Sequence, residues 1–264
     1  MTTNDQHPRP TARAFTEALR RREQVLGYWV VLDSPVSTER VARLGYDYVC
    51  IDAQHGLVEY GGILRGLTAI DAGGRSVGLV RVGANDPFHI GQALDAGAAG
   101  VIVPLVSSAG DAAAAVAAAT YPPLGVRSYG PMRSALRVGP VPAEANASVA
   151  VLAMIETPEG LENVEDICAV PGLTGVYVGP SDLCLAVGGA FPGDPAVADV
   201  FEAALVRIGK AAANAGVAAG IHTPSGDDAA RRLAQGFTFA TVSSDLVHLE
   251  RAAADHLAKA GGTA

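Results

Sequence analysis

The sequence predicts a single α/β domain of the (β/α)8 class, the TIM barrel. The chain has 264 residues, of which 49% are hydrophobic and 17% are charged, a balance that suits one large close-packed domain. Short apolar runs rich in β-branched residues recur eight times, and Ala-rich stretches with helical spacing lie between most of them. Eight strand–helix units in about 250 residues match the size of this barrel.

The expected strands follow one another along the whole chain. We place them at residues 25–32, 46–52, 76–82, 100–105, 149–156, 175–179, 217–222 and 237–243. Helices are expected at residues 38–45, 86–97, 108–121, 159–170, 195–216 and 226–236, with a C-terminal helix over 246–261. Several of them begin at Ser, Thr or Asp and end at Gly, which are the residue types that cap helix ends. A doubly wound open sheet is the alternative, but the GxGxxG motif that would follow its first strand is replaced by LDSP.

Two segments fall outside the strand–helix pattern. Residues 1–13 are polar, and we expect a flexible N-terminal tail there, followed by one domain over residues 14–264. Residues 121–148 are rich in Pro and Gly and predict a long loop between the fourth helix and the fifth strand.

Composition argues against several classes of partner. The chain has 19 Lys and Arg against 27 Asp and Glu, a net charge of −8, which disfavours nucleic acid and anionic membranes as partners. No apolar run reaches the roughly 18 residues of a membrane helix. The 3 cysteines form no CxxC pair, so neither a disulfide framework nor a zinc site is indicated. A reducing cytoplasm is the expected location.

Two carboxylates at the predicted strand ends indicate a cation site, because barrel active sites lie at the C-terminal ends of the strands. Glu156 and Asp182 end or follow neighbouring strands, so we expect them close together. Two carboxylates without Cys suit a hard divalent cation such as Mg²⁺ or Mn²⁺, with Co²⁺ possible. The alternative is that each carboxylate only caps the helix that follows it.

Further polar groups are expected beside this pair. The turn before Asp182 consists of Gly179, Pro180 and Ser181, and its backbone amides could bind a small carboxylate. Arg81 lies in an apolar strand, so its charge requires a ligand or a buried anion. An ion pair with another barrel residue is the alternative for Arg81.

An acid–base pair is expected at the end of the second strand. Asp52 and His55 stand three residues apart, close enough for the carboxylate to orient the imidazole for proton transfer. A Schiff-base mechanism is disfavoured because the 2 lysines, Lys210 and Lys259, fall in a helix and near the C-terminus. No GxSxG motif of a serine hydrolase occurs.

Several segments resemble the HpcH/HpaI family of class II, metal-dependent 2-oxo acid (pyruvate) aldolases. They are IDAQHG, RVGANDPFHIGQALDAGAAGVIVPLV, YPPLGVRS, MIETPEGLENVEDI and GVYVGPSDL. The resemblance runs from about Gly27 to Asp245, nearly the whole chain. It implies a (β/α)8 barrel, commonly a hexamer built as a trimer of dimers, that reversibly cleaves a 4-hydroxy-2-oxo acid into pyruvate and an aldehyde.

The resemblance implies a role for each matching residue. Glu156 and Asp182 would bind the metal, Arg81 would contact the pyruvate oxygen and stabilise the enolate, and Asp52 and His55 would be the catalytic acid–base pair. His55 would relay the proton to or from the C4 hydroxyl.

Two further matches and two departures concern the surroundings of the site. Asp95 would neighbour the site of an adjacent subunit, and Trp29 would line the pocket. Where relatives often have Glu, the chain has the neutral Gln54. Where many have Gln, it has Met154. Both departures bear on substrate choice, and neither removes a metal ligand.

Two other functions remain open at this stage. A malyl-CoA or citramalyl-CoA lyase would use a similar carboxylate pair and would need a basic surface for the CoA phosphates. Arg127, Arg133 and Arg137 in the long loop form the only cluster of that kind. A non-catalytic barrel that binds a small acid is the third candidate.

Overall fold

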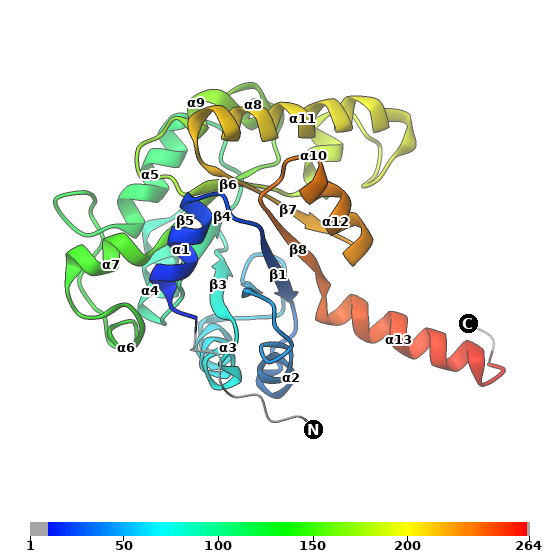
Figure 1. Cartoon of the computed structure of the whole chain (residues 1–264), viewed down its shortest axis with the longest axis horizontal. Coiled ribbons are helices and arrows are strands. Elements are labelled where there is room, and N and C mark those ends of the chain that lie inside the picture. The colour runs from blue at the N-terminus through cyan, green and yellow to red at the C-terminus, as the bar shows by residue number, and fades with distance from the viewer. Residues whose placement is uncertain (1–9, 263–264) are drawn as a thin grey trace.

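A computed structural model describes residues 10–262 and shows a closed barrel of eight parallel strands (Figure 1). The strands pair in chain order, and the eighth closes on the first. They are β1 (Val25–Val30), β2 (Tyr48–Asp52), β3 (Val77–Arg81), β4 (Gly100–Val103), β5 (Ala150–Ile155), β6 (Gly175–Val178), β7 (Ala218–Thr223) and β8 (Phe239–Ser244). The predicted fold class is confirmed, and every predicted strand end lies within two residues of the observed one.

Helices surround the barrel, and each of the seven predicted helical segments overlaps an observed helix. They are α2 (Pro35–Val41), α3 (Tyr60–Gly73), α4 (Pro87–Asp95), α5 (Ala109–Ala119), α8 (Pro158–Glu162), α9 (Val164–Cys168), α10 (Pro180–Ala186), α11 (Ala198–Ala215), α12 (Gly226–Ala234) and α13 (Asp245–Lys259). A short 3₁₀ turn, η1 (Pro195–Val197), precedes α11. Ser108, Asp86 and Ser225 cap the helices that they precede, each by accepting a hydrogen bond from a backbone amide.

Helix α3 is absent from the sequence-based prediction. Its sequence contains 4 glycines, which lower helix propensity. The structure explains one of them, because a Cβ at Gly66 would overlap the side chain of Ile51 on β2. Helix α3 therefore forms because it packs closely against the sheet, an effect that helix propensity does not measure.

The segment predicted as a long loop, residues 121–148, contains two short helices. They are α6 (Ala135–Val138) and α7 (Pro142–Ser148). Because the segment runs from the end of α5 to the start of β5, it lies at the N-terminal end of the barrel, away from the strand ends that carry polar residues.

Helix α1 (Ala12–Arg20) closes the N-terminal end of the barrel. Phe15 and Leu19 are buried in the apolar cluster of the barrel interior, and the rings of Phe15 and Tyr48 lie 5.7 Å apart. Residues 1–9 of the predicted tail lie outside the described residues. The helix begins two residues before the expected domain boundary at residue 14.

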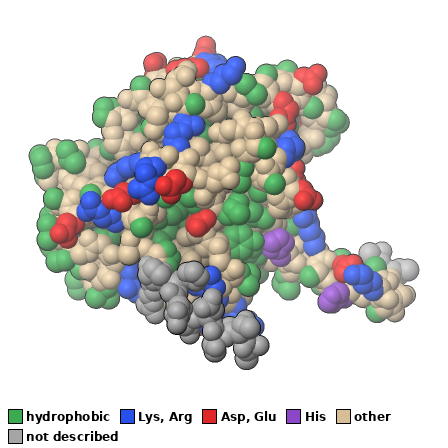
Figure 2. All heavy atoms as spheres, viewed as in Figure 1, with side chains coloured by type: hydrophobic (Ala, Val, Ile, Leu, Met, Phe, Trp, Pro, Cys, Tyr) green, Lys and Arg blue, Asp and Glu red, His purple; other side chains and the backbone are tan. Residues whose placement is uncertain are grey.

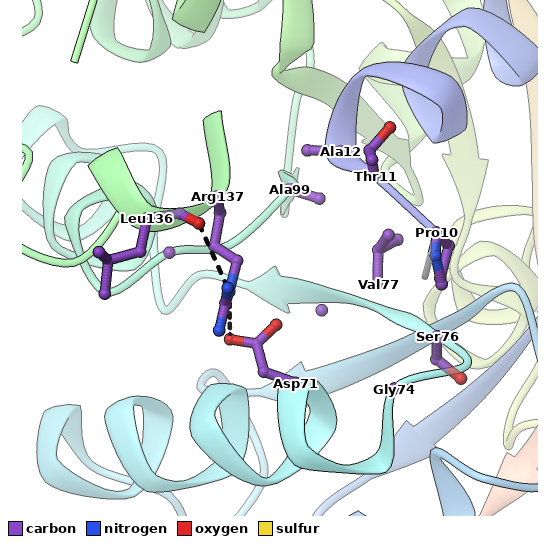
Figure 3. Close-up of a pocket in the computed structure, with 12 residues that line it drawn as sticks. Pro10, Thr11, Ala12, Asp71, Gly74, Ser76, Val77, Ala99, Leu136 and Arg137 are labelled. Atoms are coloured by element: carbon purple, nitrogen blue, oxygen red, sulfur yellow. Dashed lines mark hydrogen bonds and ion pairs between the residues drawn. The ribbon is translucent and has the colours of Figure 1, made fainter. Parts of the chain in front are cut away.

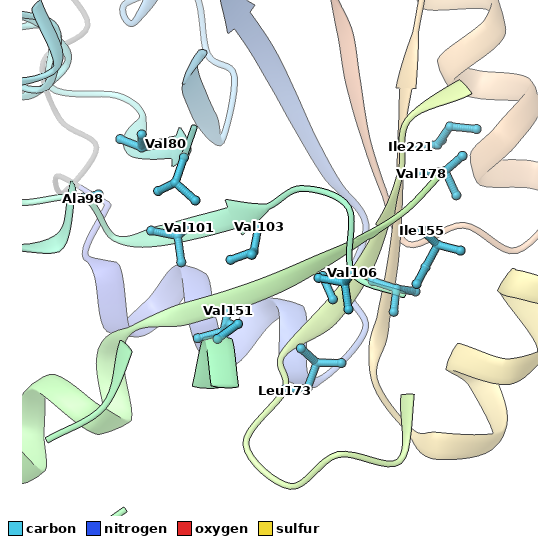
Figure 4. Packing of buried hydrophobic residues seen from close by; sticks show 14 of the residues in the cluster. Val80, Ala98, Val101, Val103, Val106, Val151, Ile155, Leu173, Val178 and Ile221 are labelled. Carbon is cyan, nitrogen blue, oxygen red and sulfur yellow. The ribbon is translucent and has the colours of Figure 1, made fainter. Parts of the chain in front are cut away.

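Two apolar layers stabilise the barrel. Between strands and helices lie small and branched side chains such as Val101, Val151 and Ile155 (Figure 4). The interior is more aromatic, since Tyr177 packs on Phe239 with ring centroids 5.8 Å apart. These bulky residues fill the barrel below the strand ends and leave space only at the rim.

Helix α13 projects from the barrel (Figures 1 and 2), and none of its residues is buried. Its first residue anchors it, because the Asp245 carboxylate accepts hydrogen bonds from the backbone amides of Val31 (3.0 Å) and Leu32 (3.2 Å). Among residues 10–262, no helix has the length and apolar character needed to cross a membrane.

Candidate active site

A cavity of about 250 Å³ opens at the C-terminal ends of the strands. Seven of the ten residues predicted for the site line it: Trp29, His55, Arg81, Gly179, Pro180, Ser181 and Asp182. Closure of the barrel brings these residues together from segments up to 153 positions apart, Trp29 to Asp182.

Arg81 and Asp52 form a buried ion pair at the ends of neighbouring strands β3 and β2. Arg81 Nε donates to Asp52 Oδ1 (2.9 Å) and Nη2 donates to Oδ2 (2.5 Å). The indole nitrogen of Trp29 donates to the same Oδ2 (3.2 Å), and its ring centroid lies 5.1 Å from Arg81 Cζ. Burial alone would raise the pKa of Asp52, but the hydrogen bonds and charge of Arg81 hold it below its ordinary value.

The structure gives Asp52 a different partner from the imidazole that the sequence predicts. Its Oδ1 accepts the backbone amides of Gln54 (3.0 Å) and His55 (3.2 Å). No hydrogen bond within the described chain joins this carboxylate to the His55 ring, which is exposed at the cavity. The reason is local geometry: in a turn, an Asp carboxylate reaches the amides two and three residues ahead more readily than their side chains. Asp52 therefore positions Arg81 and the turn that bears His55.

Glu156 follows β5 and is 3% exposed. Its Oε1 accepts the backbone amide of Leu105 (2.8 Å), a residue whose φ of 55° lies in the left-handed region. Its Oε2 is buried and has no hydrogen-bond partner among the described residues. Burial raises the pKa of Glu156, and so does the negative charge of Asp182, while the Leu105 amide and Arg81 act in the opposite direction.

Neither carboxylate acts as a helix cap by hydrogen bonding. Thr157, not Glu156, caps α8 by accepting the amide of Gly160. Asp182 lies inside the first turn of α10, and the cap residue Gly179 makes no side-chain bond. Helix capping therefore does not explain the two carboxylates.

The donor set fits a divalent cation. The free Oε2 of Glu156 faces Gly179, where a Cβ would overlap it and would lie 2.8 Å from Met154 Cε. Within residues 10–262, no group of three or more His, Cys, Asp or Glu side chains could hold a metal ion. A cation held by Glu156 and Asp182 would take its remaining ligands from water or substrate oxygens.

The sequence as a whole matches a known family. The model of the HpcH/HpaI aldolase/citrate lyase family matches residues 25–252. The chain belongs to this family. Aldolases and citrate lyases both break carbon–carbon bonds, so the protein is a carbon–carbon lyase.

Members of the HpcH/HpaI family with assigned activities are similar over most of the chain. A hydroxypyruvate/pyruvate aldolase from Rhizorhabdus wittichii is 41% identical over 236 residues, which cover 89% of this chain and 93% of that protein. A 4-hydroxy-2-oxovalerate aldolase from Rhodococcus jostii is 37% identical, with 88% and 90% covered. A solved HpcH/HpaI family protein from Burkholderia cenocepacia has a TM-score of 0.87 at 35% identity, covering 95% of this chain and all of that one. Macrophomate synthase has a TM-score of 0.84 at 27% identity, covering 98% and 91%.

One cavity residue has no role in the sequence analysis. His222, on β7, places its ring edge-on to Trp29, with centroids 5.4 Å apart. Burial, together with the positive charge of Arg81, lowers the pKa of His222 to about 4. The imidazole is therefore neutral near pH 7. A polar residue ending an otherwise apolar strand was the signal available in the sequence.

Asp95 and the arginine cluster lie at the opposite end of the barrel from this site. Asp95 Oδ1 accepts a hydrogen bond from Arg127 (2.7 Å). Arg137 pairs with Asp71 (2.7 Å), beside a cavity of about 170 Å³ (Figure 3), and Arg133 also pairs with Asp71. Because these arginines pair with carboxylates of the same chain and lie far from the strand ends, they do not support a CoA-binding surface for this site.

Proposed function

We propose that the protein is a metal-dependent class II aldolase that reversibly cleaves a 4-hydroxy-2-oxo acid into pyruvate and an aldehyde. The observation that carries the proposal is the buried, unpartnered Oε2 of Glu156 near Asp182, beside a cavity lined by Arg81 and His55. The names of the curated relatives support the same reaction class.

Glu156 and Asp182 would hold the divalent cation, which we propose to be Mg²⁺, Mn²⁺ or Co²⁺. When bound, such a cation would polarise the C2 ketone and stabilise the enolate charge. Arg81, held in place by Asp52, donates hydrogen bonds to the oxygens of the 2-oxo acid. The amides of Ser181 and Asp182 offer further donors to its carboxylate.

His55 is the proposed proton carrier at the C4 hydroxyl. As it removes the hydroxyl proton, the C4 oxygen becomes the aldehyde carbonyl and the C3–C4 bond breaks. The electron pair of that bond becomes the C2–C3 double bond of the enolate. Protonation at C3 then gives pyruvate, and the reverse sequence forms the new bond.

Pyruvate release by metal-depleted protein tests this function. Racemic 4-hydroxy-2-oxo acids are supplied to chelator-treated protein, with Mg²⁺, Mn²⁺ or Co²⁺ then added. We expect pyruvate only after a metal is added. Metal binding without pyruvate from any of these acids would contradict the proposal and favour a CoA-thioester lyase or a non-catalytic acid-binding barrel.

We also propose a homo-oligomer, a hexamer built as a trimer of dimers, in which Asp95 neighbours the site of another subunit. Light scattering coupled to size-exclusion chromatography gives the mass directly, and a monomer at micromolar concentration would contradict it. The expected cytoplasmic location stays a prediction.

A further inference from the structure

A second, larger cavity adjoins the candidate active site. Its volume is about 520 Å³, and Pro180, Ser181 and His222 line both cavities. His222 therefore stands where the reacting part of a bound substrate would meet the part that extends beyond it. No step of the proposed mechanism uses this residue or this space.

His222 presents a hydrogen-bonding group to this boundary. Its ring lies on the inner face of β7 against Trp29, whereas the neighbouring Ile221 packs into the outer apolar layer. The side chain is partly exposed, and no hydrogen bond joins it to any residue between 10 and 262. A neutral imidazole has one N–H donor and one acceptor nitrogen, which matches the donor and acceptor of an alcohol hydroxyl.

The second cavity is lined by three acidic and three basic side chains and by neutral hydrogen-bonding groups. Arg231 pairs with Asp228 (2.7 Å) and Arg232 pairs with Glu202 (2.6 Å). The third arginine of the lining, Arg251, donates to the backbone carbonyl of Pro224 (2.9 Å). The hydroxyl of Ser243, a residue that is 1% exposed, has no partner in the described chain. The cavity thus offers neutral hydrogen-bonding groups, and its acidic and basic lining side chains are equal in number, so it carries no excess positive charge for a carboxylate or phosphate.

We propose that His222 selects aldehydes that carry a hydroxyl group, and that the second cavity receives the substrate beyond C4. The proposal rests on the proposed aldolase function, in which Arg81 and the carboxylate pair hold the 2-oxo acid end. The remaining chain would then leave the site past His222. The substrate class is therefore a 4-hydroxy-2-oxo acid with a further hydroxyl on its aldehyde portion.

Competing acceptors of equal size test this proposal. The ratio of kcat/KM for glycolaldehyde to that for propionaldehyde is measured with pyruvate as donor. His222→Leu should lower this ratio about tenfold, because it removes a hydrogen bond to the substrate hydroxyl. His222→Gln, which keeps a donor and an acceptor, should stay within about threefold of the wild-type ratio. His256→Leu, an identical exchange at an exposed position of α13, should leave the ratio unchanged.

Two results would overturn the proposal. One is an unchanged ratio in folded His222→Leu. The other is a ratio that changes only when hydroxypyruvate replaces pyruvate as donor, since His222 would then recognise the donor and not the aldehyde. The aldolase function has its own control, because metal-dependent exchange of the pyruvate methyl protons in deuterated water needs no aldehyde. If the wild-type protein catalyses this exchange but His222→Leu leaves the ratio unchanged, only the selection by His222 is refuted. If the wild-type protein gives neither exchange nor aldol product, the aldolase function and the selection by His222 are both refuted.

Discussion

Glu156, the proposed metal ligand, shows how a side chain placed for function can oppose stability. One carboxylate oxygen accepts the Leu105 amide, while the other is buried without a partner in the described chain. A buried carboxylate that is only half satisfied favours the protonated form, which agrees with the raised pKa of this group. The residue is thus suited to bind a cation, and it destabilises the folded protein when no cation is bound.

Glu156→Gln tests both sides of this argument. Activity should fall about 100-fold or more, since even groups outside the ligand set of metal sites cost 10- to 100-fold. The melting temperature of the metal-free protein should rise by about 2–4 °C for about 1 kcal/mol, because the buried charge is gone. Calorimetry of metal-free wild type and variant at pH 7 measures the second effect. A variant that keeps full metal-stimulated activity would refute the ligand assignment.

Asp52 illustrates the opposite case, a buried carboxylate with every hydrogen bond made. Asp52→Asn should destabilise the protein by about 3–5 kcal/mol, because Arg81 keeps its buried charge and loses its counter-ion. The pKa of Asp52 is lowered, so the pair stabilises the fold above the unfolded-state value of about 3.9, and that contribution disappears as the pH falls through the folded-state value. Urea unfolding between pH 3 and 7 should show that the free energy of unfolding of the wild type decreases as the pH falls. The decrease should be smaller in the variant.

At the scale of elements, the short turns after β4 and β6 place the carboxylates. The left-handed Leu105 aims its amide at Glu156, and Gly179 leaves room for the Glu156 carboxylate beside α10. Strained or Cβ-free positions of this kind commonly occur where the backbone must serve a site.

The substitution Gly179→Ala therefore tests the positioning of the Glu156 carboxylate separately from the folding of the barrel. The added methyl would overlap Glu156 Oε2, so we expect metal affinity and activity to fall at least tenfold while the barrel still folds. Gly209→Ala is the matched control, because a Cβ added at this position of α11 would meet no atom within 4 Å. That substitution should stabilise the protein by about 0.5–1 kcal/mol and leave activity intact. Equal activity in the two variants would contradict the role of Gly179.

At the scale of the whole molecule, the proposed metal binding would be coupled to folding. A cation that binds only the folded barrel should raise the melting temperature by about 5–10 °C at 100 times its Kd. Because the pKa of Glu156 is raised, protons compete with the cation at a higher pH than for an ordinary carboxylate. Scanning calorimetry with Mn²⁺ at pH 5 and pH 7 should show that the cation raises the melting temperature less at pH 5. An increase of the same size in Glu156→Gln would place the cation elsewhere.

The order of residues along the chain is enough to predict the barrel and which residues meet at the candidate site. Eight apolar runs at regular spacing define the fold, since parallel strands with helical crossovers have few ways to close. Strand ends then bring Arg81, Glu156 and Asp182 to one rim, as the count of strand ends predicts. Helix α3 and the short helices within residues 121–148 were missed, because local propensity there is weak and packing decides.

Which groups interact depends on the closed barrel. Sequence spacing paired Asp52 with the His55 imidazole, whereas the carboxylate binds Arg81 of the neighbouring strand, because β2 and β3 align these two residues side by side. The free oxygen of Glu156 and the place of His222 between two cavities likewise depend on distances across the barrel. Side-chain pairing in a barrel is set by neighbouring strands in space, and a linear sequence records only neighbours along the chain.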